Sequence, residues 1–246
     1  MLEVKELHKQ FGSIHAVNGV SFKVEQGEVL GFLGPNGAGK STTMRMITGF
    51  LPPTSGTAVV NGHDVITAPI AAKNQIGYLP ENAPVYSDMT VVNFLRFAAE
   101  IRGFSGSARL RCVDAAIEKA HLEKVRNQSI STLSKGYRQR TCFAQAILHD
   151  PPILIMDEPT DGLDPNQKHV VRAMIREMAP RKVIIISTHI LEEVEAVCSR
   201  AIIIANGRIV ANGTPAELKT RTDSHGTLED VFRALTLGDE PLRKVS

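Results

Sequence analysis

A lysine and a serine close a glycine-rich stretch in the first part of the chain. The stretch Gly34–Ser41 satisfies every specified position of the pattern G-x-x-x-x-G-K-[ST], whose backbone N–H groups cradle phosphates. In this pattern Lys40 is expected to reach the β- and γ-phosphates of a nucleoside triphosphate, and Ser41 to bind Mg²⁺. The residues predicted to contact the nucleotide are Gly34, Pro35, Asn36, Gly37, Ala38, Gly39, Lys40, Ser41 and Thr42. The alternative is a simple glycine turn with an exposed lysine.

The segments on either side of this stretch favour the phosphate site. The apolar run Val29–Leu33 is typical of a buried parallel strand, and Thr42–Thr48 can continue as a helix that Gly49 ends. A strand, a glycine loop and a helix N-terminus together place inward-pointing N–H groups at a positive helix end. The sequence therefore predicts a nucleoside triphosphate site.

Two carboxylates follow a second apolar run. Asp157 and Glu158 come directly after Ile153–Met156, at the carboxyl end of an expected strand, where open α/β sheets bind their ligands. Asp157 there can hold Mg²⁺, and Glu158 can polarise an attacking water as a general base. The alternative is a solvated strand end, although the glycine-rich stretch upstream favours the catalytic interpretation.

Composition sets limits on the partners. The chain has 246 residues, 43% apolar and 22% charged, and a net charge of +2, so no nucleic-acid-binding surface is expected. No apolar run approaches the ~20 residues of a membrane-spanning helix. We expect a soluble chain that reaches a membrane only through a partner. Cysteines, the basic end Arg243–Lys244 and most histidines are interpreted as ordinary surface or core residues; these histidines are His8, His15, His63, His121, His149, His169 and His225.

The apolar pattern changes along the chain. It is typical of strands up to about residue 80, of helices from about 90 to 146, and of alternating strands and helices afterwards. Apolar helix faces are expected at Phe94, Leu95, Phe97 and Ala98, and at Leu110, Val113, Ala116, Ile117 and Ala120. Asn206-Gly207 predicts a two-residue hairpin turn, and Thr214–Glu217 predicts a capping box.

Further motifs establish a family resemblance. Ser134 can cap a helix, its plainest role, and Leu133–Tyr137 lies upstream of the carboxylates. With these in order, the chain resembles the ATP-binding subunit of an ABC transporter. The matching stretches are Gly34–Ser41 for Walker A, Leu133–Tyr137 for the signature, Ile153–Glu158 for Walker B, Asp161–Asp164 for the D-loop and His189 for the switch histidine.

The resemblance implies a fold and an activity. The fold is α/β: a P-loop NTPase (RecA-like) core with a mixed sheet, an antiparallel β subdomain and a helical subdomain inserted at about 86–150, all in a single domain, 1–246. The activity is ATP hydrolysis with ATP and Mg²⁺ as cofactors, between two copies of the chain. The implied roles are catalysis by Glu158 and His189, adenine stacking by Phe11, action in trans by Ser134, Lys135, Gly136 and Tyr137, the D-loop by Asp164, and metal binding by Ser41, Glu81 and Asp157.

The chain departs from the family pattern at two places. Lys135 and Tyr137 replace residues of the usual Leu-Ser-Gly-Gly-Gln signature, and Glu81 stands in place of the Q-loop glutamine. These departures and the stretch Leu228–Phe232 resemble the type-two exporter branch. Lys135 of one copy could offset the charge of Glu81 in the other; alternatively it points to solvent.

The implied partner is an integral-membrane permease subunit on whose cytoplasmic face the chain docks as a peripheral protein. Exposed apolar side chains at Val85, Tyr86 and Met89 are the candidates for that contact, and packing within the helical insertion is the alternative. Two rival functions stay open: a soluble ABC ATPase without a role in transport, and a regulatory module that binds ATP without hydrolysing it.

Overall fold

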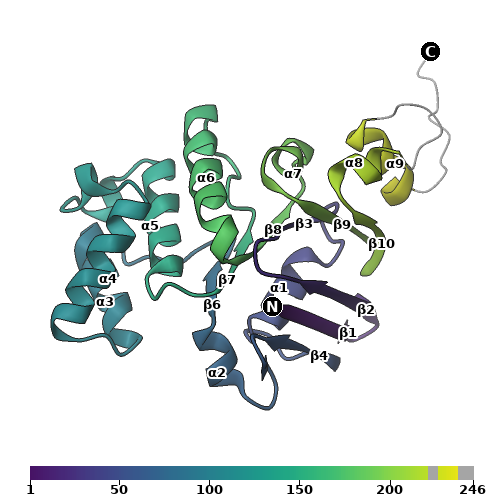
Figure 1. Ribbon diagram of the computed structural model, residues 1–246, viewed down its shortest axis with the longest axis horizontal. Helices are drawn as coiled ribbons and strands as arrows, with labels where there is room; N and C mark the ends of the chain where they lie inside the picture. Colours follow the sequence, from purple (N-terminus) through teal and green to yellow (C-terminus); the bar gives the residue numbers. More distant parts are fainter. Residues whose placement is uncertain (221–226, 238–246) are drawn as a thin grey trace.

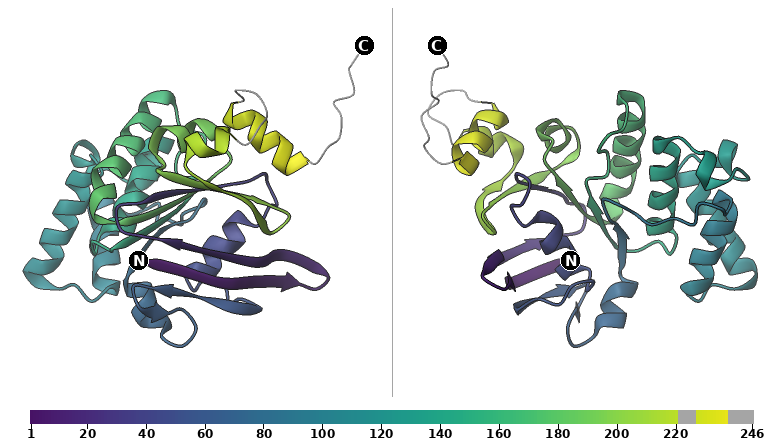
Figure 2. Two further views of the ribbon diagram at one scale, coloured as in Figure 1. Left: turned by 45° about the vertical axis from the view of Figure 1, so that its right-hand side comes forward. Right: turned by 180° about the vertical axis from the view of Figure 1, so that it is seen from behind.

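The protein is described here from a computed structural model, which places residues 1–220 and 227–237. The strands of this part of the chain form two sheets, one of six strands and one of four (Figures 1 and 2). His225 and the basic end Arg243–Lys244 lie outside the described residues. The P-loop NTPase class predicted from the motifs is confirmed, with a mixed sheet and a separate antiparallel sheet.

The six-stranded sheet carries the glycine loop and both carboxylates. Its order is β10-β9-β3-β8-β7-β6, and every neighbouring pair is parallel except β10 with β9. Every residue of β3, β7 and β8 is buried, which explains their continuous apolar runs. The strands are β3 (Val29–Leu33), β6 (Ile76–Leu79), β7 (Ile153–Asp157), β8 (Val183–Thr188), β9 (Arg200–Ala205) and β10 (Arg208–Gly213).

The four-stranded sheet is antiparallel and has the order β2-β1-β4-β5. Along β1 the apolar residues Leu2 and Val4 alternate, and Leu7 follows three residues later, one position out of phase. A register shift between Val4 and Leu7, with Glu6 at φ 45°, returns Leu7 to the buried face. The strands are β1 (Leu2–Phe11), β2 (Ile14–Val24), β4 (Ser55–Val60) and β5 (His63–Asp64).

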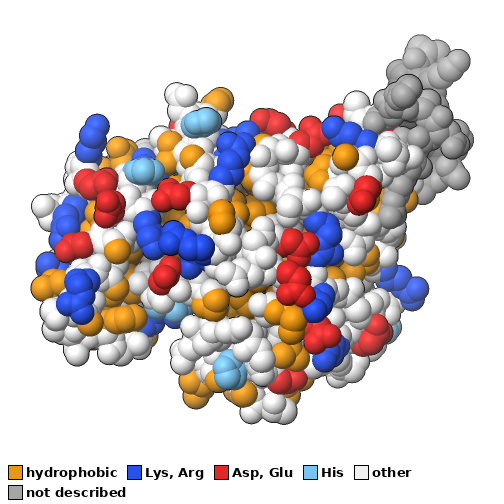
Figure 3. All heavy atoms as spheres, in the orientation of Figure 1, with side chains coloured by type: hydrophobic (Ala, Val, Ile, Leu, Met, Phe, Trp, Pro, Cys, Tyr) orange, Lys and Arg blue, Asp and Glu red, His pale blue; other side chains and the backbone are white. Residues whose placement is uncertain are grey.

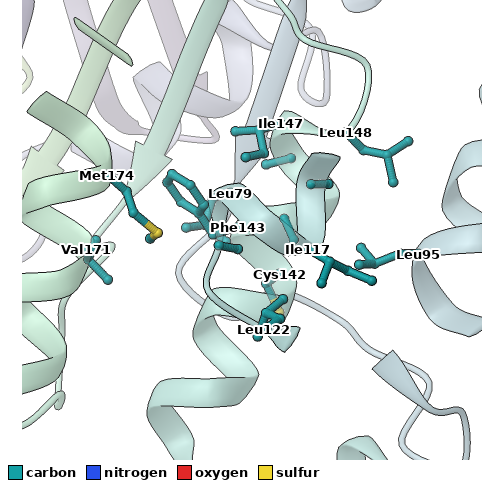
Figure 4. Packing of buried hydrophobic residues seen from close by; sticks show 14 of the residues in the cluster. Leu79, Leu95, Ile117, Leu122, Cys142, Phe143, Ile147, Leu148, Val171 and Met174 are labelled. Carbon is teal, nitrogen blue, oxygen red and sulfur yellow. The ribbon is translucent and has the colours of Figure 1, made fainter. Parts of the chain in front are cut away.

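Helices α3, α4 and α5 gather at one end of the molecule (Figures 1 and 2). Their buried faces form a core with apolar residues of β6, β7 and α6, part of which Figure 4 shows. The apolar faces predicted for this region are buried except at Leu110, which is 46% exposed because α4 turns that side to solvent. The elements are α3 (Val91–Ile101), α4 (Gly106–Lys119), η1 (Glu123–Val125), η2 (Ile130–Thr132) and α5 (Lys135–Ile147).

Local signals in the sequence correspond to local structure. Asn206 and Gly207, both with positive φ, turn β9 into β10, and Thr214 forms the predicted capping box with Glu217. The sequence interpretation had not included the short helices α2 and α7. The remaining helices are α1 (Lys40–Ile47), α2 (Pro69–Asn74), α6 (Pro165–Met178), η3 (Ala179–Arg181), α7 (Leu191–Val197), α8 (Pro215–Lys219) and α9 (Leu228–Leu237). None of the described helices is long and apolar enough to cross a membrane.

Candidate nucleotide site

A cavity of about 490 Å³ opens beside the N-terminus of α1. Its wall combines the glycine loop with residues that come from three distant parts of the chain, Glu81, Glu158 and His189. From the predicted phosphate-binding stretch, the residues on this wall are Pro35, Asn36, Gly37, Gly39, Lys40, Ser41 and Thr42. The cavity therefore brings together the nucleotide-binding and the catalytic residues expected from the sequence.

Gly34 and Gly39 are required by close backbone contacts. A Cβ on Gly34 would lie 2.5 Å from the carbonyl oxygen of Ile204, and one on Gly39 would lie 2.4 Å from that of Ala16. Gly39 also has a φ of 103°, a left-handed conformation that favours glycine. The loop is therefore pressed between β9 and β2, so that its open side faces the cavity.

Lys40 is buried, with only 6% of the residue exposed, so the alternative of an exposed lysine in a plain turn is wrong. Its Nζ donates to the carbonyl oxygens of Gly34, at 2.7 Å, and Pro35, at 3.3 Å. The same Nζ lies 3.7 Å from Oε1 of Glu158. These contacts hold a positive charge at the wall of the cavity, where it can neutralise a phosphate.

Glu158 and His189 face one another. Nδ1 of His189 lies 3.0 Å from Oε2 of Glu158, and the imidazole is 45% exposed while the carboxylate is 9% exposed. The backbone of Glu158 has a φ of 49°, and its N–H donates to Ser187 O at 2.9 Å. This left-handed residue turns the chain away from β7 and directs the carboxylate towards Lys40.

Asp157 lies beneath this pair. It is 1% exposed and accepts a hydrogen bond from the hydroxyl of Ser187 on the neighbouring strand. Among the described residues, no group of three or more His, Cys, Asp or Glu side chains could hold a metal ion. Mg²⁺ characteristically takes one or two protein carboxylates together with substrate phosphates. The oxygens of Ser41, Asp157 and Glu81 fit such a mixed set.

The signature segment begins α5 and does not line the cavity of its own chain. Ser134 caps the helix, accepting from Tyr137 N at 3.4 Å, as its plain role requires. Lys135 Nζ lies 3.9 Å from Oδ2 of Asp161, an exposed pair within the chain. Neither solvent alone nor a second copy was needed to give Lys135 a partner.

Two further side chains of the first turns of α5 rest on the loop after β7. A Cβ on Gly136 would lie 2.6 Å from Oε1 of Gln167, and Gln139 Nε2 donates to Pro159 O at 3.1 Å. Tyr137 packs its ring beneath the guanidinium of Arg140, whose Cζ is 4.3 Å from the ring centroid. The signature is thus fixed to the D-loop inside one chain.

Two predicted site residues take local positions. Asp164 caps α6, accepting from the backbone N–H groups of Asn166 and Gln167 at 3.0 Å each. Phe11 is 48% exposed, with Lys9 Nζ 5.1 Å from its ring centroid, and it is not among the residues that line the cavity. Adenine stacking by Phe11 and a D-loop role for Asp164 stay predictions.

The cavity also contains residues that sequence reasoning had not assigned. Ala16 of β2 lines it, and nothing in the sequence distinguishes this alanine from its neighbours. Asp161 lines it as well, and its place in the D-loop motif was the available signal. Residues that support His189 from behind, in α7, carried no signal because that helix had not been predicted.

A groove of about 840 Å³ lies along α3, apart from the nucleotide cavity. Tyr86, Phe97 and Ile101 line it, with Tyr86 meeting Phe97 edge-on at 5.2 Å between ring centroids. Figure 3 shows the outline of the molecule notched between the helical end and the part that carries α2. Val85 and Met89, expected to be exposed, are half-buried because they pack against the helical core.

The fold and the cavity define an ATP-binding cassette of the P-loop class. The sequence model of the family described as ABC transporter matches residues 17–161, more than half of the chain. The chain belongs to the ABC transporter family and is an ATP-binding subunit of that family. A solved structure titled "Structure of ATP binding subunit of ABC transporter" matches with a TM-score of 0.85 and 32% identity, over 96% of this chain and 99% of that one.

Curated relatives are similar over most of this chain. The Nod factor export ATP-binding protein I of Cupriavidus pinatubonensis is 36% identical, over 89% of this chain and 67% of its own length. The uncharacterized ABC transporter ATP-binding protein YxlF of Bacillus subtilis is 38% identical over 92% and 75%. The probable multidrug ABC transporter ATP-binding protein YbhF of Escherichia coli is 37% identical over 90% of this chain, which spans only 38% of YbhF.

Proposed function

We propose that this chain hydrolyses ATP and thereby powers an exporter in the membrane. The observation that carries the proposal is the position of Glu158, whose two carboxylate oxygens lie 3.7 Å from Lys40 Nζ and 3.0 Å from His189 Nδ1. A binding module without hydrolysis would not need a carboxylate held between these groups. The names of relatives, which include Nod factor export and multidrug transporters, support export as the direction.

Each residue of the cavity has a distinct part in the reaction. Glu158 accepts a proton from the attacking water while the water oxygen bonds to the γ-phosphorus and the ADP oxygen leaves. His189, donating from Nδ1, holds the Glu158 carboxylate and faces the reacting phosphate. Lys40 and the N–H groups of the glycine loop neutralise the phosphate charge.

Mg²⁺ bound with ATP would neutralise charge on the β- and γ-phosphates. Ser41 would supply a hydroxyl oxygen for it, and Asp157 a carboxylate oxygen held in place by Ser187. Glu81 lines the same cavity and offers a further carboxylate, where the family has a neutral glutamine. This extra charge distinguishes the site from those with the usual Q-loop.

The active unit of this proposal is a dimer. The N-terminus of α5, capped by Ser134, offers backbone N–H groups but does not line the cavity of its own chain. In a dimer that encloses ATP, Ser134 and Gly136 of one copy would contact the γ-phosphate bound by the other. The phosphate then joins the two copies, and hydrolysis releases them.

The membrane partner is an integral permease, and the groove along α3 is its docking site. Phe50, Tyr86 and Ile101 are 74%, 55% and 70% exposed there, an apolar surface suited to a short helix. The chain would be peripheral, bound to the cytoplasmic face through that permease. A soluble ABC ATPase would have no need of this surface.

The test compares the purified chain with Lys40→Ala, alone and reconstituted with the membrane protein encoded beside it. We expect the chain to hydrolyse ATP, the permease to stimulate it, and Lys40→Ala to lose nucleotide affinity because a buried cation at the phosphates is gone. ATP binding without turnover would favour the regulatory module. Turnover that no permease alters would favour the soluble ATPase.

A further inference from the structure

Glu193 is a buried carboxylate that the proposed reaction does not use. It belongs to α7 and is only 2% exposed. Its Oε1 is buried and has no hydrogen-bond partner among the described residues. Burying a carboxylate incompletely paired costs stability, so its retention calls for an explanation in the function of the site.

The other oxygen of Glu193 supports the segment that carries His189. Oε2 accepts a hydrogen bond from Thr188 Oγ1 at 3.0 Å, and the same hydroxyl accepts one from the backbone N–H of Ile190 at 3.0 Å. Thr188 and Ile190 are the two neighbours of His189 in the chain. This pair of bonds therefore fixes the backbone on both sides of the imidazole.

Helix α7 is itself seated firmly on the strand that leads into the glycine loop. A Cβ on Gly31 of β3 would lie 3.2 Å from Cγ2 of Val194 and 3.0 Å from Sγ of Cys198. Val194 follows Glu193 and is fully buried. Because β3 ends directly at the glycine loop, Glu193 is held at a fixed position relative to the phosphate-binding backbone.

We propose that Glu193 is a positioning residue for hydrolysis, which acts through Thr188 to hold His189 Nδ1 against Glu158. The inference rests on the proposed function. It deepens that function by adding α7 to the elements that the reaction requires. The hydrogen-bonded path runs from Glu193 to Thr188 and across the fixed backbone to His189, which lies 3.0 Å from the general base.

The charge of Glu193 is not required for this role. Burial raises the pKa of the Glu193 carboxyl, while the hydrogen bond from Thr188 and the charges of Arg172 and Lys168 oppose the rise; Glu158 adds to it. A carboxyl oxygen can accept from the Thr188 hydroxyl in either protonation state. An amide oxygen can do the same, so Glu193→Gln is the conservative variant.

The test separates turnover from binding in two pairs of variants. Thr188→Val and Glu193→Leu remove the bond and should lower kcat about 10- to 100-fold, since small misplacements cost this much, with the ATP affinity unchanged. Thr188→Ser and Glu193→Gln keep the bond and should retain most of the turnover. Thr57→Val is the matched control, because Thr57 Oγ1 donates to Asp64 Oδ2 at 2.9 Å in the antiparallel sheet.

A second readout does not depend on activity. The ring ¹⁵N signals of His189, recorded without nucleotide, should shift in Thr188→Val in the same direction as in Glu158→Ala, and should not shift in Thr57→Val. Unchanged kcat and ring signals in Thr188→Val would overturn the inference, as would equal losses in Thr188→Ser. If the parent chain lacks ATPase activity, the proposed function fails separately, and the ring signals still decide whether Thr188 holds His189.

Discussion

Glu158 combines an unusual backbone with an unusual environment. Its φ of 49° is a left-handed conformation that costs a non-glycine residue on the order of 1 kcal/mol or more. The bond from its N–H to Ser187 O maintains this turn, and Lys40 and His189 flank its carboxylate. Backbone strain of this kind is found at sites where the side-chain direction matters to function.

Replacing Glu158 with glutamine removes the proton acceptor and leaves the phosphate cradle intact. We expect Glu158→Gln to lower the steady-state rate of ATP hydrolysis by ~10²–10⁴-fold while retaining nucleotide affinity. Asp161→Asn is the control, because Asp161 lines the same cavity but does not contact Lys40's carboxylate partner. Equal losses in the two variants, measured by phosphate release, would contradict the assignment of Glu158 as the base.

At the scale of elements, α5 and the loop after β7 form one unit. Lys135, Gly136 and Gln139 each contact a different residue between Pro159 and Gln167. The signature of one copy and the loop that follows its own general base are therefore mechanically joined. A signal from the partner's phosphate can reach Glu158 through this contact.

The contact between Gly136 and Gln167 predicts a change of sign. In a helix, Gly→Ala is favourable by up to about 1 kcal/mol, but at Gly136 the new methyl group would overlap Gln167. We expect Gly136→Ala to be neutral or destabilising in the parent chain and stabilising in a Gln167→Ala background. Urea unfolding of the four variants measures this coupling, and additive free energies of unfolding would rule out the packing constraint.

His149 joins α5 to α3 and β6 at the edge of the helical end. Its Nε2 lies 3.0 Å from Arg102 Nη1 and 3.1 Å from Ile76 O. Burial, reinforced by the charge of Arg102, lowers the pKa of His149 from an ordinary 6.5 to about 4. The ring is therefore neutral in the folded chain at physiological pH, as a core histidine would be.

This lowered pKa predicts how stability depends on pH. Between pH 6.5 and about 4 the unfolded chain binds a proton that the folded chain refuses, so the free energy of unfolding should fall as the pH is lowered through this window. Replacing His149 with Gln should reduce the difference in stability between pH 7 and pH 5. Asp150, whose pKa is lowered by Lys182, titrates below this window. An unchanged difference in denaturant titrations would exclude His149 as its source.

At the scale of the whole molecule, the α3 groove and the nucleotide cavity are separate surfaces. We expect Ile101→Ser to weaken co-purification with the permease, because the side chain is 70% exposed within the groove. Ile70→Ser is the matched control, since Ile70 is 76% exposed on α2 and does not line the groove. Similar weakening by both variants would count against the groove as the docking site.

The charge of Glu81 concerns the dimer. Glu81 and Lys135 line one hollow of about 450 Å³ within a chain, yet Lys135 pairs with Asp161. If Lys135 offsets Glu81 of the second copy, Glu81→Gln and Lys135→Gly should show a coupling of ~0.5 kcal/mol or more in ATP-driven dimerisation. The cycle is best measured in Glu158→Gln, where ATP persists, and strictly additive effects would leave Lys135 with its intrachain role alone.

The sequence by itself determined the features that depend on neighbouring residues. The phosphate loop between β3 and α1, the Asn206-Gly207 turn and the Thr214 capping box were all predictable, because consecutive residues supply the bonds and dihedral angles involved. The motifs in order also indicated the family and the fold class. Leu110 and the short α7 were missed because burial and short helices depend on what packs against them.

Only the tertiary structure decided which of these features meet. The strand order places β3 beside β8 and β8 beside β7, so the glycine loop, His189 and Glu158 emerge together at the carboxyl ends of neighbouring strands. No local pattern encodes strand order, which follows from burying all faces of the sheet at once. The same packing placed Ala16 at the cavity, Gln167 on Gly136, and Glu193 behind Thr188. These contacts join residues distant along the chain or in an unpredicted helix, so they appear only once the layers are assembled.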